Sequence, residues 1–187
     1  LRPLADYAAL AIPSGRIRHY DVRVEKLESD KLGSLIENWQ RGHKWCRVER
    51  NKSWFNWRYS GDTESDYEWV CAYENGDLKA LAIWGLRNRK WGPIYDGRAH
   101  LTELLGSNPY ALQAVLKTVV QQARRRKAIL LETVTNIPLV QTSLKRVGFY
   151  RHKEIPLIVR SLSNINFGAN IHYHPNWRIS GGDVDTF

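Results

Sequence analysis

Two strand-like stretches joined by an Asn-Gly pair constrain the fold of this chain more than any other feature. Residues 67–73 and 78–84 are rich in aromatic and aliphatic side chains, and Asn75-Gly76 lies between them. Both turn positions tolerate the positive φ angles of a tight two-residue turn, so the pattern predicts a β-hairpin. Cys71 lies among these strand residues and is expected to be a small buried side chain.

The chain after the hairpin alternates between strand and helix patterns. The expected elements are a short strand at 92–97, a helix from Pro109 to Lys127, a central strand at 128–135, a helix at 139–147 and an edge strand at 155–162. The first helix rests on apolar residues that recur at steps of three and four. Pro109 suits its first position, and Gly148 is a typical stop for the second helix.

The N-terminal part adds fewer elements. Residues 1–20 are expected to be a lead-in, residues 21–27 a half-buried strand, residues 30–41 a helix and residues 53–59 a short helix. Residues 163–187, rich in Asn, Gly, His and Asp, are interpreted as a C-terminal tail that packs on or extends the domain. The prediction is one α/β (α+β) domain at 21–162, with a mixed sheet flanked by helices on both faces.

Composition narrows the class of protein without naming a partner. The 187 residues can bury a core without metal or disulfides, and the formal charge of +9 favours anionic partners such as phosphate-bearing cofactors, nucleic acid or acidic lipid. The two cysteines show no CxxC spacing, so neither a zinc site nor a disulfide framework is indicated, and two free thiols fit a reducing cytosol better than secretion. No apolar run is long enough to span a membrane. The chain starts at Leu1 and contains no Met, which indicates a piece of a longer protein.

Basic and aromatic residues alternate in residues 41–58, which carry six Lys or Arg against one Glu. Such a mixture suits a single-stranded nucleic-acid surface, because bases stack on aromatic rings while phosphates pair with cations. The alternative, which we favour, is a short amphipathic helix whose Trp side chains fill the core. The cations of residues 124–127 lie in the last turn of a helix, where they complement its dipole.

Several short stretches resemble the GNAT acyltransferase superfamily. Residues 136–138 and 143–149 are similar to its later half, where a helix after the central strand ends in Gly-Phe. Residues 54–59 and 177–185 resemble bacterial GNAT-like proteins of surface-polysaccharide biosynthesis. The resemblance covers about residues 21–185. It implies a GNAT-like fold and transfer of an acyl group from acetyl-CoA or another acyl-CoA to an amine, for example an amino sugar.

The resemblance also implies where the cofactor binds. The family places a glycine-rich loop for the pyrophosphate before the long helix, but this chain has only Gly106 there, followed by Ser107 and Asn108. These three residues are candidates for pyrophosphate binding, but Ser107 or Asn108 can also cap the helix, and capping is the favoured role for Ser107. The end of the central strand would contact the acyl-pantetheine part through Thr133, Val134, Thr135 and Asn136.

Catalytic candidates follow from the same resemblance. The family often has a Tyr as general acid four residues before the Gly of Gly-Phe, but Leu144 stands there, so Tyr150 is the nearest candidate. Candidates for the general base are Asp96, His100 and Glu132. Glu132 is the sharpest, since a carboxylate inside an apolar strand is poorly solvated. The alternative is an ordinary ion pair with a neighbouring Lys or Arg.

Substrate-binding candidates come from the two stretches with the narrower resemblance, and they are Trp57, Arg58, Tyr59, Asp183 and Asp185. His172 and His174 could join the two Asp residues in a metal site, but a flexible polar tail is the favoured interpretation. Three functions remain open: a cytosolic N-acyltransferase, a GNAT-like binding module without catalysis, and a basic nucleic-acid-binding domain. The third has the least support, because no recognition motif accompanies the charge.

Overall fold

A computed structural model describes residues 20–27, 29–40, 48–59, 66–86, 97–151 and 178–180. The expected elements at 92–97 and 155–162 therefore lie wholly or almost wholly outside the described residues, as do the lead-in and most of the C-terminal tail. The elements are β1 (Asp21–Val24), η1 (Ser29–Leu32), α2 (Gly33–Gln40), α3 (Lys52–Tyr59), β2 (Tyr67–Glu74), β3 (Asp77–Leu86), β4 (Arg98–Gly106), α4 (Pro109–Arg125), β5 (Leu130–Glu132) and α5 (Pro138–Arg146).

The described strands form one mixed sheet in the order β1-β2-β3-β4-β5. The first three pairings are antiparallel, and β5 is parallel to β4. The predicted hairpin is confirmed: Asn75 and Gly76 have φ angles of 54° and 84°, the left-handed values that the turn requires. Cys71 is buried, as predicted.

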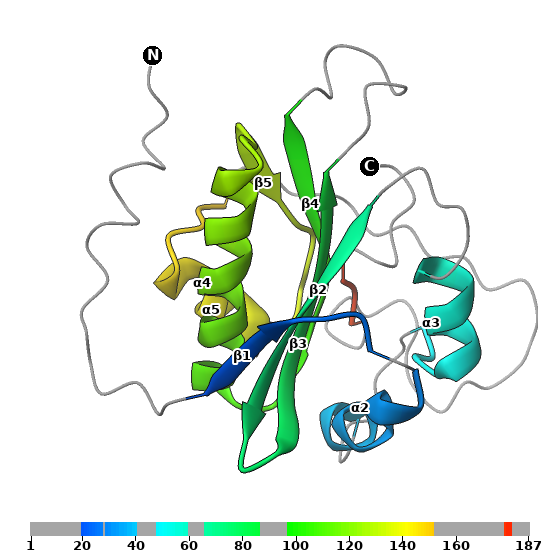
Figure 1. Ribbon diagram of the computed structural model, residues 1–187. Coiled ribbons are helices and arrows are strands. Elements are labelled where there is room, and N and C mark those ends of the chain that lie inside the picture. Colours follow the sequence, from blue (N-terminus) through cyan, green and yellow to red (C-terminus); the bar gives the residue numbers. More distant parts are fainter. Residues whose placement is uncertain are drawn as a thin grey trace, which may run out of the picture.

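Helices cover both faces of the sheet, as Figure 1 shows. Helices α4 and α5 lie on one face, where α4 packs on β2, β3 and β4, and α2 lies on the other face against β3 and β4. The predicted α/β class with a mixed sheet between helices is confirmed. The structure corrects the sequence prediction in β4, because residues 98–106 were not expected to form a strand.

Strand β4 is the most deeply buried of the described strands, since every residue from Ala99 to Gly106 is buried. It also contains an irregularity. Ile83 pairs with Glu103 and Trp84 pairs with Leu101, so Thr102 is an extra residue on β4 and donates its hydroxyl to the Ile83 carbonyl at 3.1 Å. Such bulges bend a strand and re-aim its side chains, and they are frequent next to active sites.

Helix α4 begins as its sequence predicts, with Pro109 in the first turn. Of the two predicted caps, Asn108 caps the helix, and the Ser107 side chain is exposed. Gly106 links β4 to α4 with a φ of 155°, and a Cβ atom there would lie 2.9 Å from the Lys79 carbonyl oxygen. Glycine is therefore needed at this position for packing.

The aromatic helix α3 contributes to the core in a different way from the prediction. Its buried side chains are Phe55 and Tyr59, which contact Trp69 on β2 with ring centroids 5.9 Å apart in each case. Trp57 is 68% exposed. The interpretation that the Trp residues of this helix fill the core is therefore wrong for Trp57, and Phe55 and Tyr59 take that role.

Candidate functional site

Strands β4 and β5 separate after a short parallel pairing. Their last paired residues are His100 and Glu132, so β5 has three residues instead of the eight expected at 128–135. The Thr133 hydroxyl donates to the Leu101 carbonyl at 2.7 Å, just beyond the pairing. From Val134 the chain then leaves β4 as irregular backbone, which gives a segment whose amides are not committed to the β4–β5 ladder.

The predicted cofactor residues that follow β5 use their polar side chains to hold this segment. Thr135 accepts the Ile137 amide at 3.1 Å through its hydroxyl, and its carbonyl accepts the Gln141 side chain at 3.1 Å. Asn136 accepts the Ile179 amide at 2.9 Å through its side-chain oxygen. These side chains fix the segment, so a ligand in the split would meet mainly its backbone and Val134.

The most buried charged group of the described chain lies beside this split. Glu103, on the bulged part of β4, is 0% exposed, and Arg50, which precedes α3, is 2% exposed. Arg50 Nη2 lies 3.1 Å from Glu103 Oε1 and 2.6 Å from Ser180 Oγ, and Ser180 Oγ lies 3.1 Å from the same Oε1. Arg50 also lies over the Trp54 ring at 4.6 Å. We call Arg50, Glu103 and Ser180 the buried polar triad.

Of the predicted substrate residues on α3, only Tyr59 approaches the triad. Burial, with a further contribution from the Glu103 charge, raises the pKa of Tyr59 well above its ordinary value of 10.0, so the hydroxyl stays neutral. Arg58 is half-buried and its guanidinium lies 5.9 Å from the exposed Trp57 ring. Trp57 thus lies on the outer side of α3, whereas Arg58 lies close enough to the buried Tyr59 for its charge to act on that hydroxyl.

The predicted base Glu132 is a paired carboxylate at the end of β5. Its Oε1 lies 3.4 Å from His100 Nε2 and 3.8 Å from Arg98 Nη1, and its side chain is 31% exposed. The alternative of an ordinary ion pair is therefore what the structure shows. His100 is buried on β4 and faces this carboxylate, so the structure brings two of the predicted bases together.

The start of α4 offers little to a pyrophosphate. Pro109 has no amide hydrogen, and the Tyr110 and Ala111 amides donate to the Asn108 side chain at 2.9 and 3.5 Å. The Leu112 amide donates to the Asn108 carbonyl at 3.0 Å. The first-turn amides are therefore absent or engaged, and only the backbone of the loop at 106–108 remains for an anion at this end.

The other predicted site residues either lie outside the described residues or are exposed. Asp96, Asp183 and Asp185 lie outside the described residues, as do His172 and His174. Tyr150, the candidate general acid, follows α5 and is 70% exposed. In the described ranges, no group of three or more metal-ligating side chains comes together.

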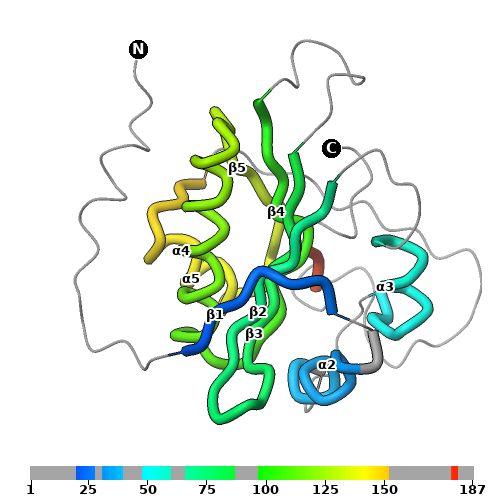
Figure 2. The backbone as a smooth tube through the Cα atoms, viewed as in Figure 1, coloured from blue at the N-terminus to red at the C-terminus, as the bar shows by residue number. Residues whose placement is uncertain are grey.

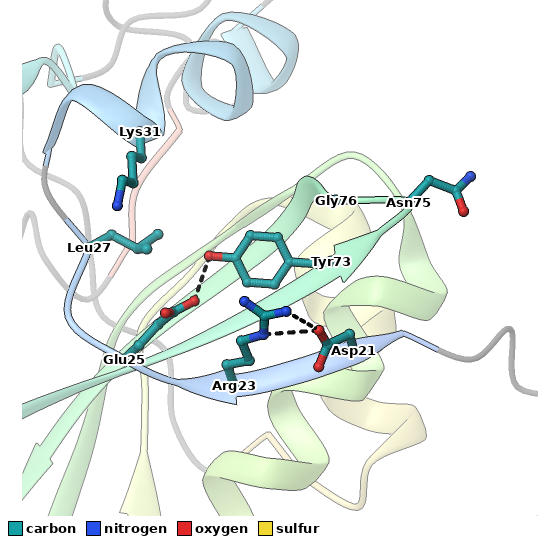
Figure 3. Close-up of a pocket in the computed structure, with 8 residues that line it drawn as sticks. All are labelled: Asp21, Arg23, Glu25, Leu27, Lys31, Tyr73, Asn75 and Gly76. Atoms are coloured by element: carbon teal, nitrogen blue, oxygen red, sulfur yellow. Dashed lines mark hydrogen bonds and ion pairs between the residues drawn. The ribbon is translucent and has the colours of Figure 1, made fainter.

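A pocket of about 370 Å³ lies at the other edge of the described sheet, near the hairpin turn (Figure 3). It is lined by Asp21, Arg23, Glu25, Leu27, Lys31, Tyr73, Asn75 and Gly76. Most of its charged groups pair with one another: Arg23 Nε donates to Asp21 Oδ2 at 2.9 Å, and the Tyr73 hydroxyl donates to Glu25 Oε1 at 2.7 Å. Burial and this hydrogen bond raise the pKa of Tyr73 above 10.0. Because these groups satisfy one another on an open edge, we take the split as the candidate site.

The basic runs give little support to a nucleic-acid surface. Arg50 of the first run is buried in the triad. In the second run, Arg126 pairs with Glu68 at 2.8 Å and lies 5.7 Å from the Trp84 ring. The neighbouring Arg124, Arg125 and Lys127 are exposed at the helix end, as predicted. No helix of the described residues is both long and apolar enough to cross a bilayer.

The triad was not predicted because β4 was not predicted. The run Leu101-Thr-Glu-Leu-Leu105 has polar side chains among apolar ones without a two-residue period, so it did not suggest a strand. One signal was available: a lone Glu among four neighbours that are mostly aliphatic, in a chain with a large surplus of Arg and Lys, favours a buried ion pair.

Comparisons with known proteins support the fold. No family model and no curated protein matches the chain. Among solved structures, a protein from Desulfovibrio desulfuricans assigned to the GNAT family of acetyltransferases has a TM-score of 0.52 at 17% identity, over 72% of this chain and 87% of that one. A ribosomal-protein-alanine N-acetyltransferase from Brucella melitensis biovar Abortus has a TM-score of 0.52 at 12% identity, over 76% and 99% of the two chains. A protein assigned as an acetyltransferase from Staphylococcus epidermidis has a TM-score of 0.51 at 14% identity, over 70% and 83%. The chain has the fold of these proteins.

Proposed function

We propose that this chain is an acyl-CoA-dependent N-acyltransferase that transfers an acetyl group to a primary amine. The observation that carries the proposal is the buried carboxylate of Glu103, held beside the point where β4 and β5 separate, in a chain with the fold of GNAT-family acetyltransferases. A split sheet offers backbone amides to a thioester, and a fixed carboxylate can accept a proton.

In the proposed reaction, acetyl-CoA supplies a thioester whose carbonyl carbon is attacked by a neutral amine. The backbone at Thr133–Thr135 would donate to the carbonyl oxygen as it gains negative charge. Glu103 would take the proton that the amine loses when the C–N bond forms, directly or through one intervening group. The C–S bond then breaks, and the thiolate takes a proton from Tyr150 or from water. Glu132 and Asp96 remain the other candidates for the base.

Two segments of the chain would bind different parts of acetyl-CoA. The segment Thr133–Asn136 would lie along the acyl and pantetheine part, and the loop Gly106–Asn108 would meet the pyrophosphate through its backbone. Because the first-turn amides of α4 are engaged, we expect the nucleotide part to add less affinity than a helix N-terminus normally gives.

The proposed acceptor, its contacts and the proposed location rest mainly on the sequence. An amino sugar of a surface-polysaccharide pathway as acceptor follows from the resemblance of residues 54–59 and 177–185, with Trp57, Arg58, Tyr59, Asp183 and Asp185 as substrate contacts. A cytosolic location suits the buried free thiol of Cys71.

A thermal-shift measurement with acetyl-CoA tests the function. At about 100 times its Kd, acetyl-CoA should stabilise the fold by about 2.7 kcal/mol. For a chain of this size that is a rise in Tm of roughly 5–11 °C. ADP serves as the control ligand, because it carries the pyrophosphate without the pantetheine arm. Thiol release in the presence of an amine panel that includes glucosamine then measures transfer.

A binding module without catalysis is the second candidate, and the engaged amides at the start of α4 favour it. The two functions separate in the same experiment. Binding without transfer to any amine would favour the module, and no Tm shift at millimolar acetyl-CoA would contradict both acyl-CoA functions.

A further inference from the structure

The short C-terminal segment Arg178–Ser180 joins parts of the chain that meet at the candidate site. We call this segment the C-terminal strap; it is the red segment between the sheet and α3 in Figures 1 and 2. The Ile179 amide donates to the Asn136 side-chain oxygen at 2.9 Å, and the Asn136 amide donates to the Ile179 carbonyl at 3.3 Å. Its next residue, Ser180, enters the buried polar triad. The strap therefore connects the segment after β5 with the carboxylate on β4.

The Ser180 hydroxyl completes a closed triangle of polar contacts. Its oxygen accepts from Arg50 Nη2 at 2.6 Å, and its hydrogen points to Glu103 Oε1 at 3.1 Å, the oxygen that Arg50 also contacts. Arg50 places a positive charge next to the Glu103 carboxylate. The neutral Ser180 hydroxyl orients the Glu103 carboxylate more than it balances the charge of that group. Two donors from different segments restrict the rotation of the carboxylate.

We propose that the C-terminal strap is part of the active site and that Ser180 is a positioning residue for Glu103. This inference rests on the proposed function. Ser180 holds one carboxylate oxygen, and the Asn136–Ile179 pair fixes the strap to the segment where the thioester is proposed to lie. The strap thus sets the carboxylate relative to the reacting carbonyl, although Ser180 is 77 positions from Glu103 in the sequence. Misplacing a reacting group by about 1 Å can lower a rate by about 100-fold.

The test compares Ser180→Ala and Ser180→Thr in the full chain, with Ser143→Ala as the matched control. Ser143 is also a buried serine, but among the described residues its hydroxyl bonds the Leu139 carbonyl of its own helix, at 2.9 Å. Steady-state acetyl transfer is measured with acetyl-CoA and the best amine of the panel. We expect Ser180→Ala to lower kcat about 10- to 100-fold with little change in the KM for acetyl-CoA. Ser180→Thr should restore most of kcat, and Ser143→Ala should keep it.

Asn136→Ala provides a second variant that loosens the strap without touching the triad directly. We expect a smaller fall in kcat in the same direction, so the proposal stays testable even where Ser180→Ala folds poorly. Thermal stability of each variant is measured alongside the rates. A purely structural strap would lower Tm in both variants and leave the kcat of the folded fraction unchanged.

Three results would overturn the inference in distinguishable ways. Wild-type kcat in folded Ser180→Ala would make the strap structural only, with the proposed function intact. A higher kcat in Ser180→Ala would make the strap a gate that blocks Glu103. Wild-type protein that neither binds acetyl-CoA nor transfers acetyl groups would reject the proposed function and the role of the strap together.

Discussion

Removing one partner of the buried Arg50–Glu103 pair should destabilise the fold more than removing both. The two side chains are 1% and 0% exposed, and their nearest N and O atoms are 3.1 Å apart. An uncompensated buried charge costs about 3–5 kcal/mol, whereas replacing both partners by apolar residues of similar size is often neutral. For a chain of this size, the single loss is a fall in Tm of roughly 6–20 °C.

The two single variants should also differ from each other. In Glu103→Leu the Arg50 guanidinium keeps its charge, because arginine does not deprotonate in proteins. In Arg50→Met the carboxyl can take up a proton, so this variant should lose less stability. The double variant Arg50→Met/Glu103→Leu should be more stable than Glu103→Leu alone.

Urea unfolding followed by Trp fluorescence measures all four proteins as a double-mutant cycle. The exposed pair Lys79–Asp77, with its N and O atoms 3.0 Å apart, is the control, and its cycle should give about 0–1 kcal/mol. The reasoning is refuted if Glu103→Leu loses less than about 1 kcal/mol. It is equally refuted if the double variant loses as much as the sum of the single variants.

Two further predictions concern packing and pH. Gly106→Ala places a Cβ 2.9 Å from the Lys79 carbonyl oxygen at a φ of 155°, and it should cost about 2–4 kcal/mol in urea unfolding. Gly33→Ala, with nothing within 4 Å, should be neutral or slightly stabilising, and equal losses would contradict this account. Burial, the main cause, raises the pKa of the Cys71 thiol from 9.0 to about 12, so the unfolded chain releases this proton at a lower pH. The free energy of unfolding should therefore fall as pH rises from 9.0 to about 12, and less steeply in Cys71→Ala; equal slopes would contradict it.

Elements with a local pattern could be predicted from the sequence. The hairpin follows from Asn75-Gly76, and the helix beginning at Pro109 follows from its apolar period. Helix α5 ends before Gly148, whose φ of 96° shows why a glycine stops the helix there. In each case, the residues that decide the structure lie within a few positions of one another.

Strand β4 could not be predicted in the same way, because helices cover both of its faces. A strand buried on both faces lacks the alternation that marks a half-buried strand. Its polar residues Thr102 and Glu103 then argue against a buried strand. The bulge at Thr102 breaks the period further. The bulge and the two polar residues obscure the strand pattern in the sequence. The same features lie beside the point where β4 and β5 separate, at the candidate site.

The triad was beyond local analysis for a related reason. Arg50 and Ser180 lie 53 and 77 positions from Glu103, and neither belongs to a motif with it. Their meeting depends on which face of β4 the bulge presents and on the path of the strap. Glu132, by contrast, was selected from its own strand, and the structure gave it the ordinary ion-pair partners that its position allows.

The choice between an enzyme and a binding module depends on why a charged pair is kept in the core. A module that only binds acyl-CoA needs the split between β4 and β5, but it has no use for a buried carboxylate that an apolar pair could replace. If Arg50→Met/Glu103→Leu keeps its stability and its Tm shift with acetyl-CoA while transfer is lost, the pair serves the chemistry. If the double variant is strongly destabilised, the pair serves the fold, and the case for catalysis by Glu103 loses its support. Measuring stability, binding and transfer on this one protein therefore separates the two functions.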